Sequence, residues 1–510
     1  MHIKNKVKET KTMKKLLALV LAMMMVLSLA PAVAEEPIEI IVGVEALASA
    51  GWPASPEEDP IYQKILEATG VSWKITLVDD YWNGMSSRIL NENIPDVFFI
   101  DAAHQDEYAN EGVLLNLDPY LDNELKDVMD FLGSTNRIPY IINGSLYSIP
   151  RLFTTGTGTG TKNQWALHVR QDWLDELGLE APTDIESLYE VAKAFSENDP
   201  DGNGIDDTFG ITGGKGIRGF HIIGMCFDYA FGNYVIERDG KITNALLQPG
   251  AVEALTWAKK FVDEDLMDPD IMTTNGTDNA VAGKVGMHMF TWPNMYKQFA
   301  IDNMKAIDPD AYWIPTGPLE NELGENNHMF PYDNVGGGDS FALSADLAKP
   351  GNEEKLEAVF KVLNYLASDE GSYLVMFGVE GVHWNMVDGK PVMVAEKAEE
   401  VNHSSTYQLM SRIEAPYLTS KFPEAERAFS YTMSVPMYEY LNTLVDAPEE
   451  VYLSDMESYI TSQLAAFVYG EREISQEEYD AFIQELNEQY NFDLYMEAAT
   501  EQLNGYGYGK

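Results

Sequence analysis

The chain has 510 residues, enough for two or more domains with sizeable cores, and its 45% hydrophobic and 11% aromatic content is typical of a globular protein. Its formal net charge of −48 argues against nucleic acid as a partner and against binding to anionic membrane surfaces. The single cysteine, Cys226, excludes an intrachain disulfide.

The first 34 residues have the pattern of a secretory signal peptide. Lys14 and Lys15 precede the apolar run Leu16–Ala30, which is too short for a membrane-spanning helix, and Ala32–Ala34 give a small-x-small cleavage pattern. No cysteine stands at the cleavage position, so a lipid-modified N-terminus is not expected. We therefore expect an exported, soluble protein that is extracellular or associated with the cell envelope, or periplasmic in a cell with two membranes.

Strand and helix patterns alternate in the region that follows. "IEIIVGVEA" predicts a first strand, and "EEDPIYQKILEATGV" predicts a helix that ends at Gly70. "VSWKITLVD" predicts a second strand, and "NIPDVFFIDA" a third, which is apolar on both faces as a buried parallel strand should be. This alternation favours βαβ units and an α/β fold.

A second α/β region follows a change of composition. "YIINGSLYSIPRLF" predicts two short strands joined by an Asn-Gly turn, and "TTGTGTGTKN" predicts a crossing between domains. "QWALHVRQDWLDELGL" predicts a strand and a helix that ends at Gly178. Thr183 and Glu186 then have the spacing of a capping box at the start of the next helix.

Two α/β lobes are therefore expected, with acidic helices from about residue 405 onward. A two-lobed protein typically binds its ligand in the crevice between the lobes. The predicted division is a signal peptide at 1–34, a first lobe formed by 35–151 plus about 345–405, and a second lobe formed by 152–344 plus about 406–510, with C-terminal helices.

The segment "DPDGNGIDD" has the ligand spacing of an EF-hand calcium loop, with Gly204 at the sixth position. Position twelve is Gly210 instead of glutamate, so another carboxylate, a bidentate Asp207 or water would have to complete the site. The non-helical "TFGITGG" that follows favours a structural clip over a calcium sensor, and the alternative is an Asx-rich turn. The predicted ligands are Asp199, Asp201, Asn203, the carbonyl of Ile205, and Asp207.

Sequence motifs for catalysis are absent, whereas aromatic residues are abundant. There is no G-x-S-x-G or H-E-x-x-H motif, and the eight histidines are scattered. Nine Trp and 27 Tyr suit stacking on sugars, although half-buried packing is the alternative for each. The tryptophans in predicted loops are Trp52, Trp82, Trp292 and Trp384.

Several motifs occur together and in order: "IPDVFFID", "YANEGVLLNLDPYL", "VRQDWLDELGLEAPTDIESLYEVAKAF", "DPDGNGIDDTFGI", "AGKVGMHM" and "YLASDEGSYLVMFGVEGVHWNMVDGKPV". With them the chain resembles the larger extracellular solute-binding proteins (family 1) of carbohydrate ABC importers, which include alginate-binding and LplA-type lipoproteins. The resemblance covers nearly all of the mature chain. Many relatives have a lipobox cysteine, which this sequence lacks, and this leaves its anchoring in doubt.

The resemblance implies a two-lobed periplasmic-binding-protein-like fold of type II, with a hinge and a C-terminal helical region. It further implies a non-enzymatic, monomeric protein that binds a sugar or oligosaccharide, delivers it to ABC permease subunits, and holds a structural Ca²⁺ in the loop described above. By the same resemblance, Trp292, His383 and Trp384 face the ligand, and Trp52 and Asp101 lie where such proteins contact sugar. Arg151 either pairs with a ligand carboxylate or braces the hinge.

Two alternatives remain open from the sequence. A secreted carbohydrate-active enzyme would need a perturbed carboxylate pair across a cleft, which spacing alone does not reveal. The same fold could instead bind peptide or serve as a sensory receptor subunit. The sequence does not identify the sugar.

Overall fold

The structure is a computed structural model, and some stretches of the chain lie outside what it describes. The described residues are 37–45, 56–133, 135–150, 152–153, 165–274, 276–291, 295–296, 298–316, 319–320, 329–332, 340–401, 407, 409, 411–412, 423–434 and 437–510. Among the described helices, none is long and apolar enough to span a bilayer.

The first lobe is built on a five-stranded sheet with the order β2-β1-β3-β15-β6. Strands β1, β2 and β3 are parallel, whereas β15 runs antiparallel to both of its neighbours. The strand bounds are β1 (Ile38–Glu45), β2 (Val71–Val78), β3 (Val97–Ile100), β6 (Ser148–Pro150) and β15 (Ser340–Leu343).

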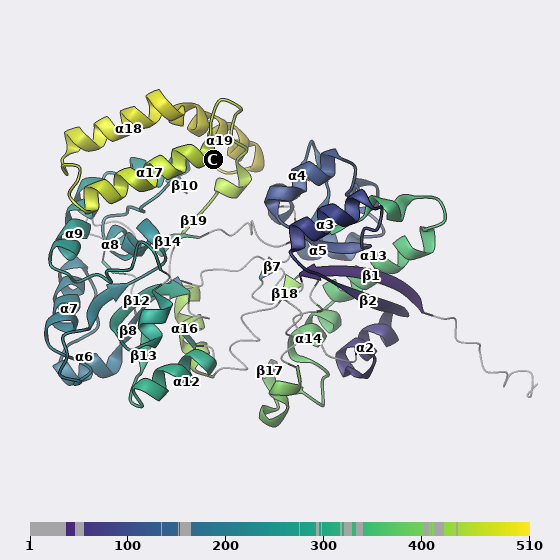
Figure 1. The fold of residues 1–510 in the computed structure, drawn as a ribbon, viewed down its shortest axis with the longest axis horizontal. Coiled ribbons are helices and arrows are strands. Elements are labelled where there is room, and N and C mark those ends of the chain that lie inside the picture. Colours follow the sequence, from purple (N-terminus) through teal and green to yellow (C-terminus); the bar gives the residue numbers. More distant parts are fainter. Residues whose placement is uncertain are drawn as a thin grey trace, which may run out of the picture.

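Helices cover both faces of this sheet (Figure 1). Val97 points to a core shared with α2, α5 and α13, whereas Phe98 and Ile100 point to a second core shared with α3 and α4, as the alternation of a strand requires. The bounds are α2 (Pro60–Thr69), α3 (Tyr81–Leu90), α4 (Ala102–Asn110), α5 (Lys126–Leu132), α13 (Glu353–Ala367) and α14 (Asp369–Phe377), with short helices η2 (Pro56–Glu58), η3 (Asp118–Tyr120), η4 (Thr135–Tyr140), η7 (Ala345–Ala348) and η8 (Ala395–Val401).

The second lobe is built on a four-stranded sheet with the order β13-β8-β12-β9. β8 is antiparallel to β12 and β13, and β12 is parallel to β9. The strand bounds are β8 (Trp165–Arg170), β9 (Phe209–Thr212), β12 (Val285–Thr291) and β13 (Trp313–Thr316).

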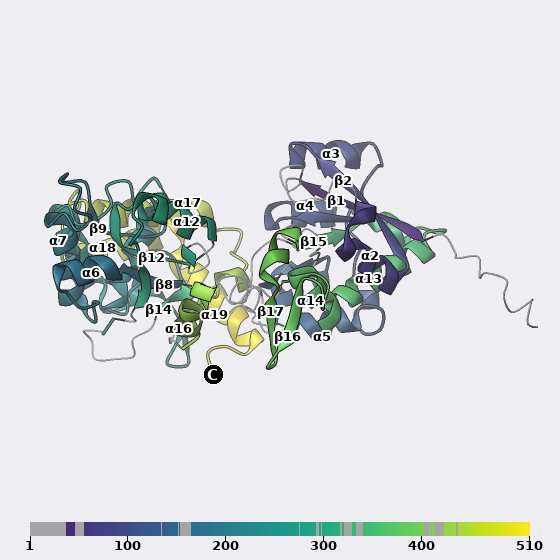
Figure 2. The same ribbon diagram turned by 90° about the horizontal axis from the view of Figure 1, so that it is seen from below.

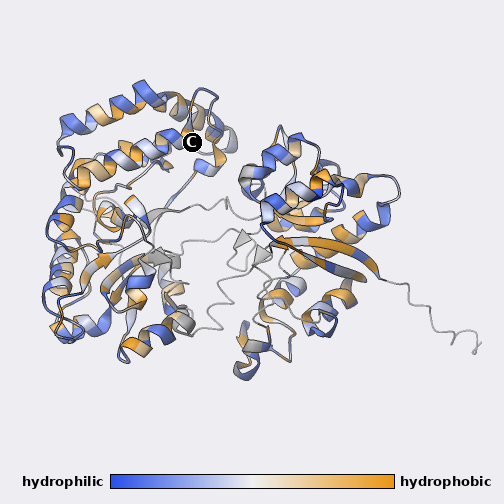
Figure 3. Ribbon diagram, in the orientation of Figure 1, coloured by the Kyte–Doolittle hydropathy of each residue, from blue (hydrophilic) through white to orange (hydrophobic). Residues whose placement is uncertain are grey.

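The C-terminal helices α17, α18 and α19 pack on the second lobe and share one hydrophobic core with β8, α7 and α9. Figure 3 shows the apolar residues on the strands and a predominantly hydrophilic outer helix α18. The bounds are α6 (Gln171–Leu177), α7 (Ile185–Glu197), α8 (His221–Met225), α9 (Ala251–Asp263), α10 (Thr277–Val281), α12 (Gln298–Ile307), α16 (Pro423–Ser434), α17 (Leu453–Val468), α18 (Gln476–Tyr490) and α19 (Phe492–Tyr506), with η5 (Gly216–Phe220), η6 (Ala245–Leu247) and η10 (Asn442–Leu444).

Short two-stranded pairs complete the described fold. The predicted Asn-Gly turn is confirmed, because Asn143 and Gly144 have φ values of 51° and 85° between paired strands. The bounds are β4 (Ile141–Ile142), β5 (Ser145–Leu146), β7 (Leu152–Phe153), β10 (Val235–Arg238), β11 (Lys241–Asn244), β14 (Met329–Tyr332), β16 (Trp384–Val387), β17 (Lys390–Met393), β18 (Ser411–Arg412) and β19 (Met437–Glu439).

The chain passes between the lobes three times: between β6 and β8, between β13 and β15, and between Leu409 and α16. The strands β7 and β18 of two of these connections pair in parallel. A hinge that the chain crosses more than once therefore joins the two lobes.

Two segments lie on the other side of the predicted domain boundaries. Strand β15, predicted for the second lobe, pairs with β3 and β6 of the first lobe. Tyr407, predicted for the second lobe, packs edge-on against Trp73, and its hydroxyl donates to Asp59 at 2.6 Å. Both segments complete the first-lobe core, although they lie far along the chain from the strands β1 to β6.

The local cap signals were partly confirmed. Helix α6 ends at Gly178 in the left-handed conformation, as predicted. The capping box of α7 instead uses Asp184 and Ser187, with the Ser187 N–H donating to the Asp184 carboxylate at 2.7 Å. The stronger carboxylate acceptor lies one residue beyond Thr183, so the helix begins one residue later than predicted.

Candidate functional site

The carboxyl edge of the first sheet is turned toward the second lobe. Helix α4, which follows β3, lies on that side of the first lobe in both views (Figures 1 and 2). In open α/β sheets, ligands bind outside the carboxyl ends of parallel strands. Asp101, which follows β3, is therefore placed to meet a ligand held between the lobes.

Asp101 follows β3 directly and is the N-cap of α4. Its Oδ1 accepts hydrogen bonds from the His104 backbone N–H at 3.0 Å and pairs with the His104 ring Nδ1 at 2.8 Å. The Asp101 side chain remains 38% exposed. Asp101 thus orients His104 through Oδ1.

Trp82 stacks face to face on His104, with ring centroids 3.7 Å apart and an interplanar angle of 7°. Phe99 and Tyr81 contact the same indole at tilted and edge-on angles. We call this pair the Trp82–His104 platform. Trp82 lies in the first turn of α3, whereas the sequence predicted a loop. His104 was not predicted as a site residue. Its position three residues after Asp101, the N-cap of α4, was the sequence signal that could have indicated it.

Three predicted ligand residues, Trp52, Arg151 and Trp292, lie outside the described residues. The strand before Trp292 is described: β12 ends at Thr291, which pairs with Trp165 at the start of β8, on the hinge side of the second sheet. Their contact with ligand stays a prediction.

His383 and Trp384 are buried, with only 1% and 4% of their surfaces exposed, which contradicts the expected ligand-facing position. The Trp384 ring stacks on Tyr373 at 5.3 Å, and its indole N–H donates to the Gly378 carbonyl. His383 Nδ1 accepts from the Val379 N–H at 2.9 Å. The i, i+4 aromatics on α14 cover the indole, so neither side chain offers a surface to ligand.

The loop between α7 and β9 holds the predicted calcium ligands, and its exit is a strand as expected. The Asn203 side-chain amide donates to Asp201 at 2.8 Å and to Asp207 at 3.2 Å. The N–H of Gly204 donates to Asp199 Oδ2, whose other carboxylate oxygen, Oδ1, is buried and accepts no hydrogen bond in the described structure. The loop thus gathers two carboxylates around the Asn203 side-chain amide and holds a third through the Gly204 N–H.

Gly210, at position twelve of the loop, has no room for a side chain. A Cβ there would lie 2.5 Å from the Ala192 carbonyl oxygen, because β9 packs directly on α7. Among the described residues, no three His, Cys, Asp or Glu side chains are placed to hold one metal ion. Burial, together with the neighbouring Asp199 and Asp207 carboxylates, raises the pKa of Asp201. Such repulsion is what a bound cation would relieve.

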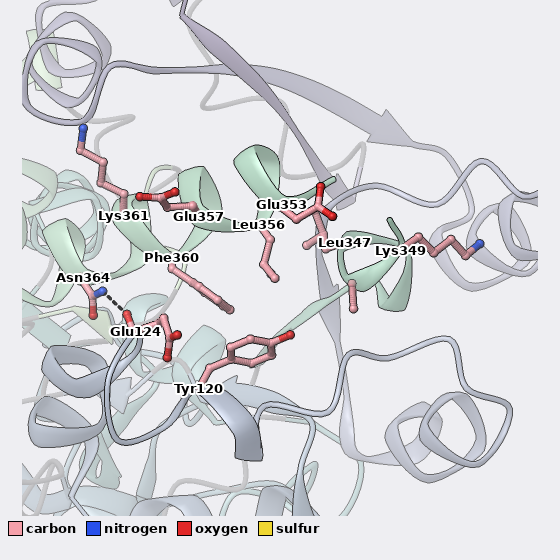
Figure 4. A pocket seen from close by; sticks show the side chains of 11 residues that line it. Tyr120, Glu124, Leu347, Lys349, Glu353, Leu356, Glu357, Phe360, Lys361 and Asn364 are labelled. Carbon is pink, nitrogen blue, oxygen red and sulfur yellow. Dashed lines mark hydrogen bonds between the residues drawn. The ribbon is translucent and has the colours of Figure 1, made fainter. Parts of the chain in front are cut away.

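A separate groove of about 720 Å³ lies within the first lobe (Figure 4). Its floor contains Tyr120, Leu356 and Phe360, with the two rings 4.9 Å apart, and charged side chains form its rim. All of its walls belong to the first lobe, so it is not a site between the lobes.

The fold and the position of the platform define the class: a two-lobed α/β binding protein with its candidate site on the face between the lobes. The profile of the family described as bacterial extracellular solute-binding protein matches residues 52–373, more than half of the chain. The chain therefore belongs to this family.

Sequence relatives agree with this assignment. Lipoprotein LipO of Bacillus subtilis is 27% identical over 404 residues, covering 76% of this chain and 72% of LipO. The polygalacturonan/rhamnogalacturonan-binding protein YtcQ of B. subtilis is 25% identical over 398 residues, covering 74% of each chain. By their names, LipO is a lipoprotein and YtcQ is a binding protein.

Solved structures share the fold across almost the whole chain. The alginate-binding protein AlgQ2 without calcium ion has a TM-score of 0.64 at 17% identity, covering 92% of this chain and 98% of AlgQ2. The Streptococcus pneumoniae substrate-binding protein FusA in complex with kestose has a TM-score of 0.65 at 18% identity, covering 92% and 99%. This confirms the two-lobed type II fold.

Proposed function

We propose that this protein is the extracytoplasmic, non-enzymatic component of an ABC importer and captures a sugar or oligosaccharide between its two lobes. The observation that carries the proposal is the Trp82–His104 platform beside Asp101, on the edge of the first sheet that faces the second lobe. Family membership supports it, as does the naming of relatives for polygalacturonan and fructooligosaccharide.

The chemistry of the platform suits a sugar. The C–H face of a pyranose or furanose ring packs on an indole, and an aspartate accepts hydrogen bonds from sugar hydroxyls. Trp52, Arg151 and Trp292 extend this ligand set in the proposal, whereas the buried His383 and Trp384 are not part of it. We propose further that the protein acts as an exported monomer that presents its ligand to permease subunits.

The test is isothermal titration calorimetry after a thermal-shift screen over neutral oligosaccharides, oligouronates and tripeptides. Trp82→Ala is expected to weaken sugar binding roughly tenfold, because it removes one stacking face. Trp257→Ala is the matched control, since Trp257 is a partly buried tryptophan on α9 of the second lobe. Equal sugar affinity in both variants would remove the platform from the site.

The same screen separates the rivals. Stabilisation by tripeptides alone would favour a peptide binder. Chromatographic detection of shortened products after incubation with oligosaccharides would favour a carbohydrate-active enzyme. Neither outcome would agree with the proposal.

We propose that the α7–β9 loop binds calcium as a structural clip. The donors that support it are Asp199, Asp201, Asn203, Asp207 and the carbonyl of Ile205. The buried, unpartnered Oδ1 of Asp199 and the raised pKa of Asp201 fit a site that gains a cation. The Asn203 amide hydrogens supply partial positive charge to two of the carboxylates.

Chelation with EGTA is expected to lower the melting temperature of the wild type by roughly 3–5 °C if calcium is present at about 100 times its Kd. Asp201→Asn should abolish this sensitivity. Asp206→Asn removes the same charge at a position without a predicted ligand role and should retain the sensitivity. An EGTA response that is identical in both variants, or absent from the wild type, would end the calcium assignment.

A further inference from the structure

The β16–β17 hairpin projects from the first lobe, and the hairpin and the residues just before it carry four well-exposed apolar side chains within eleven residues. Val382, Met386, Val387 and Val392 are 44–49% exposed. Val387 and Val392 share one face of the hairpin, and exposed apolar residues that share a face can form a contact surface. The hairpin lies on the side of its lobe that faces helix α16 of the second lobe in both views (Figures 1 and 2).

The hairpin register separates its side chains into two faces. Trp384 pairs with Met393, and both belong to the packed inner face; Met386 lies on the same side of the hairpin but is 44% exposed. The outer hairpin face consists of Asn385, Val387, Lys390 and Val392, because Asn385 pairs with Val392, and Val387 with Lys390.

The hairpin is held firmly in place. Trp384 is stacked on Tyr373 and hydrogen-bonded to Gly378, which anchors the inner face. Asp388 and Gly389 form the connecting turn, with φ values of 50° and 78° that suit a two-residue hairpin. The outer hairpin face therefore has a fixed orientation relative to the first-lobe core.

A charged contact joins the outer hairpin face to the second lobe. Lys390 Nζ lies 3.1 Å from Glu426 Oε1, and Glu426 belongs to α16. That helix is anchored in the second lobe, because Ala428 is buried in a cluster with Trp313 and Tyr296. The Lys390 and Glu426 side chains are 75% and 60% exposed, so water and salt have access to this pair.

We propose that the outer hairpin face is a contact surface for α16, and that Lys390, Glu426 and the two valines favour the approach of the lobes. The charge pair lies where the hairpin meets α16, and the adjacent Val387 and Val392 lose exposed area as the two approach. Residues outside the ligand site thereby change sugar affinity, because part of the binding free energy of a ligand held by both lobes is used to close them. The affinity part of this inference rests on the proposed function.

The experiment measures lobe separation and sugar affinity separately. Fluorescent labels on Asn123→Cys of the first lobe and Ser462→Cys of the second report the distance, and the native Cys226 is fully buried. Lys390→Glu or Glu426→Lys is expected to increase the mean separation without sugar. The same variants should weaken affinity about two- to fivefold, the size of an exposed ion pair, and less at high salt.

The double reversal Lys390→Glu/Glu426→Lys should restore both readouts. Val387→Thr/Val392→Thr, which keeps side-chain shape, should also increase the separation, whereas Met386→Gln on the inner face is the control and should not. An unchanged or shorter separation in Lys390→Glu overturns the inference. If no sugar binds the wild type, the proposed function fails, but the separation without sugar still decides this inference.

Discussion

Replacing the buried His288 with asparagine is expected to reduce the loss of stability in mild acid. His288 of β12 lies opposite His168 of β8, both fully buried, and its Nε2 lies 3.5 Å from the Thr277 hydroxyl. Burial, reinforced by the neighbouring His168, lowers the pKa of His288 to about 3 from the usual 6.5. The unfolded chain therefore takes up a proton at this position before the folded protein does.

The sign and size follow from proton linkage. Above pH 6.5 neither state is protonated, and His288 does not change the free energy of unfolding. As the pH falls below 6.5, the unfolded state is favoured by about 1.4 kcal/mol per pH unit, which amounts to about 2.7 kcal/mol at pH 4.5 and at most about 5 kcal/mol near pH 3. His288→Asn removes this contribution from the pH dependence.

The assay is urea denaturation at pH 7.5 and pH 4.5, comparing the change in unfolding free energy between the two values. Between pH 7.5 and pH 4.5, the free energy of unfolding should fall by about 2.7 kcal/mol less in the variant than in the wild type. This difference holds even where the variant is less stable at pH 7.5. Thr277→Val is the control: it removes the neighbouring hydroxyl but no titrating group, so its pH dependence should match that of the wild type. Parallel pH dependence of His288→Asn and the wild type would refute the reasoning.

Three further predictions concern packing. Trp384→Ala should lower the free energy of unfolding by about 3–5 kcal/mol and leave sugar affinity unchanged where the protein is folded. The control Met386→Ala, at an exposed position, should lower the free energy of unfolding by less than about 0.5 kcal/mol. A selective loss of sugar affinity in calorimetry would return Trp384 to the ligand site. Arg170→Lys should lower the free energy of unfolding by about 3 kcal/mol in urea denaturation, because the buried guanidinium binds both Asp172 and Asp308, and a single ammonium group cannot make both contacts. A loss below about 1 kcal/mol would contradict this. Gly286→Ala should lower the free energy of unfolding by about 1–3 kcal/mol, because the added Cβ would lie 2.0 Å from the Phe195 ring. Combining it with Phe195→Leu should restore part of that loss, whereas strictly additive losses would argue against the clash.

Much of the fold followed from local patterns. The parallel strands up to residue 100, the Asn-Gly turn and the end of α6 at Gly178 all appear where the sequence placed them. These features depend on periodicity, φ > 0 positions and capping, which are properties of neighbouring residues. The loop at 199–207 likewise follows from spacing alone.

The candidate site was less predictable, since its contacts join distant residues. Asp101 was expected from the family resemblance, and its place directly after a strand follows from local pattern. The stacking of Trp82 on His104 requires two helices on one face of the sheet, and neither sequence segment reveals the other. Trp384 was placed in a loop and, by the family resemblance, toward the ligand, but Tyr373 and Phe377 cover it in space.

The sequence by itself determined the α/β class, the family resemblance and the order of the donors in the calcium-like loop. Only the tertiary structure decided that β15 and Tyr407 return to the first lobe, that Gly210 has no room for a twelfth ligand, and that Lys390 meets Glu426 of the other lobe. The reason is physical: hydrophobic burial and capping have short periods along the chain, whereas the choice of a packing partner depends on shape and distance across the whole molecule.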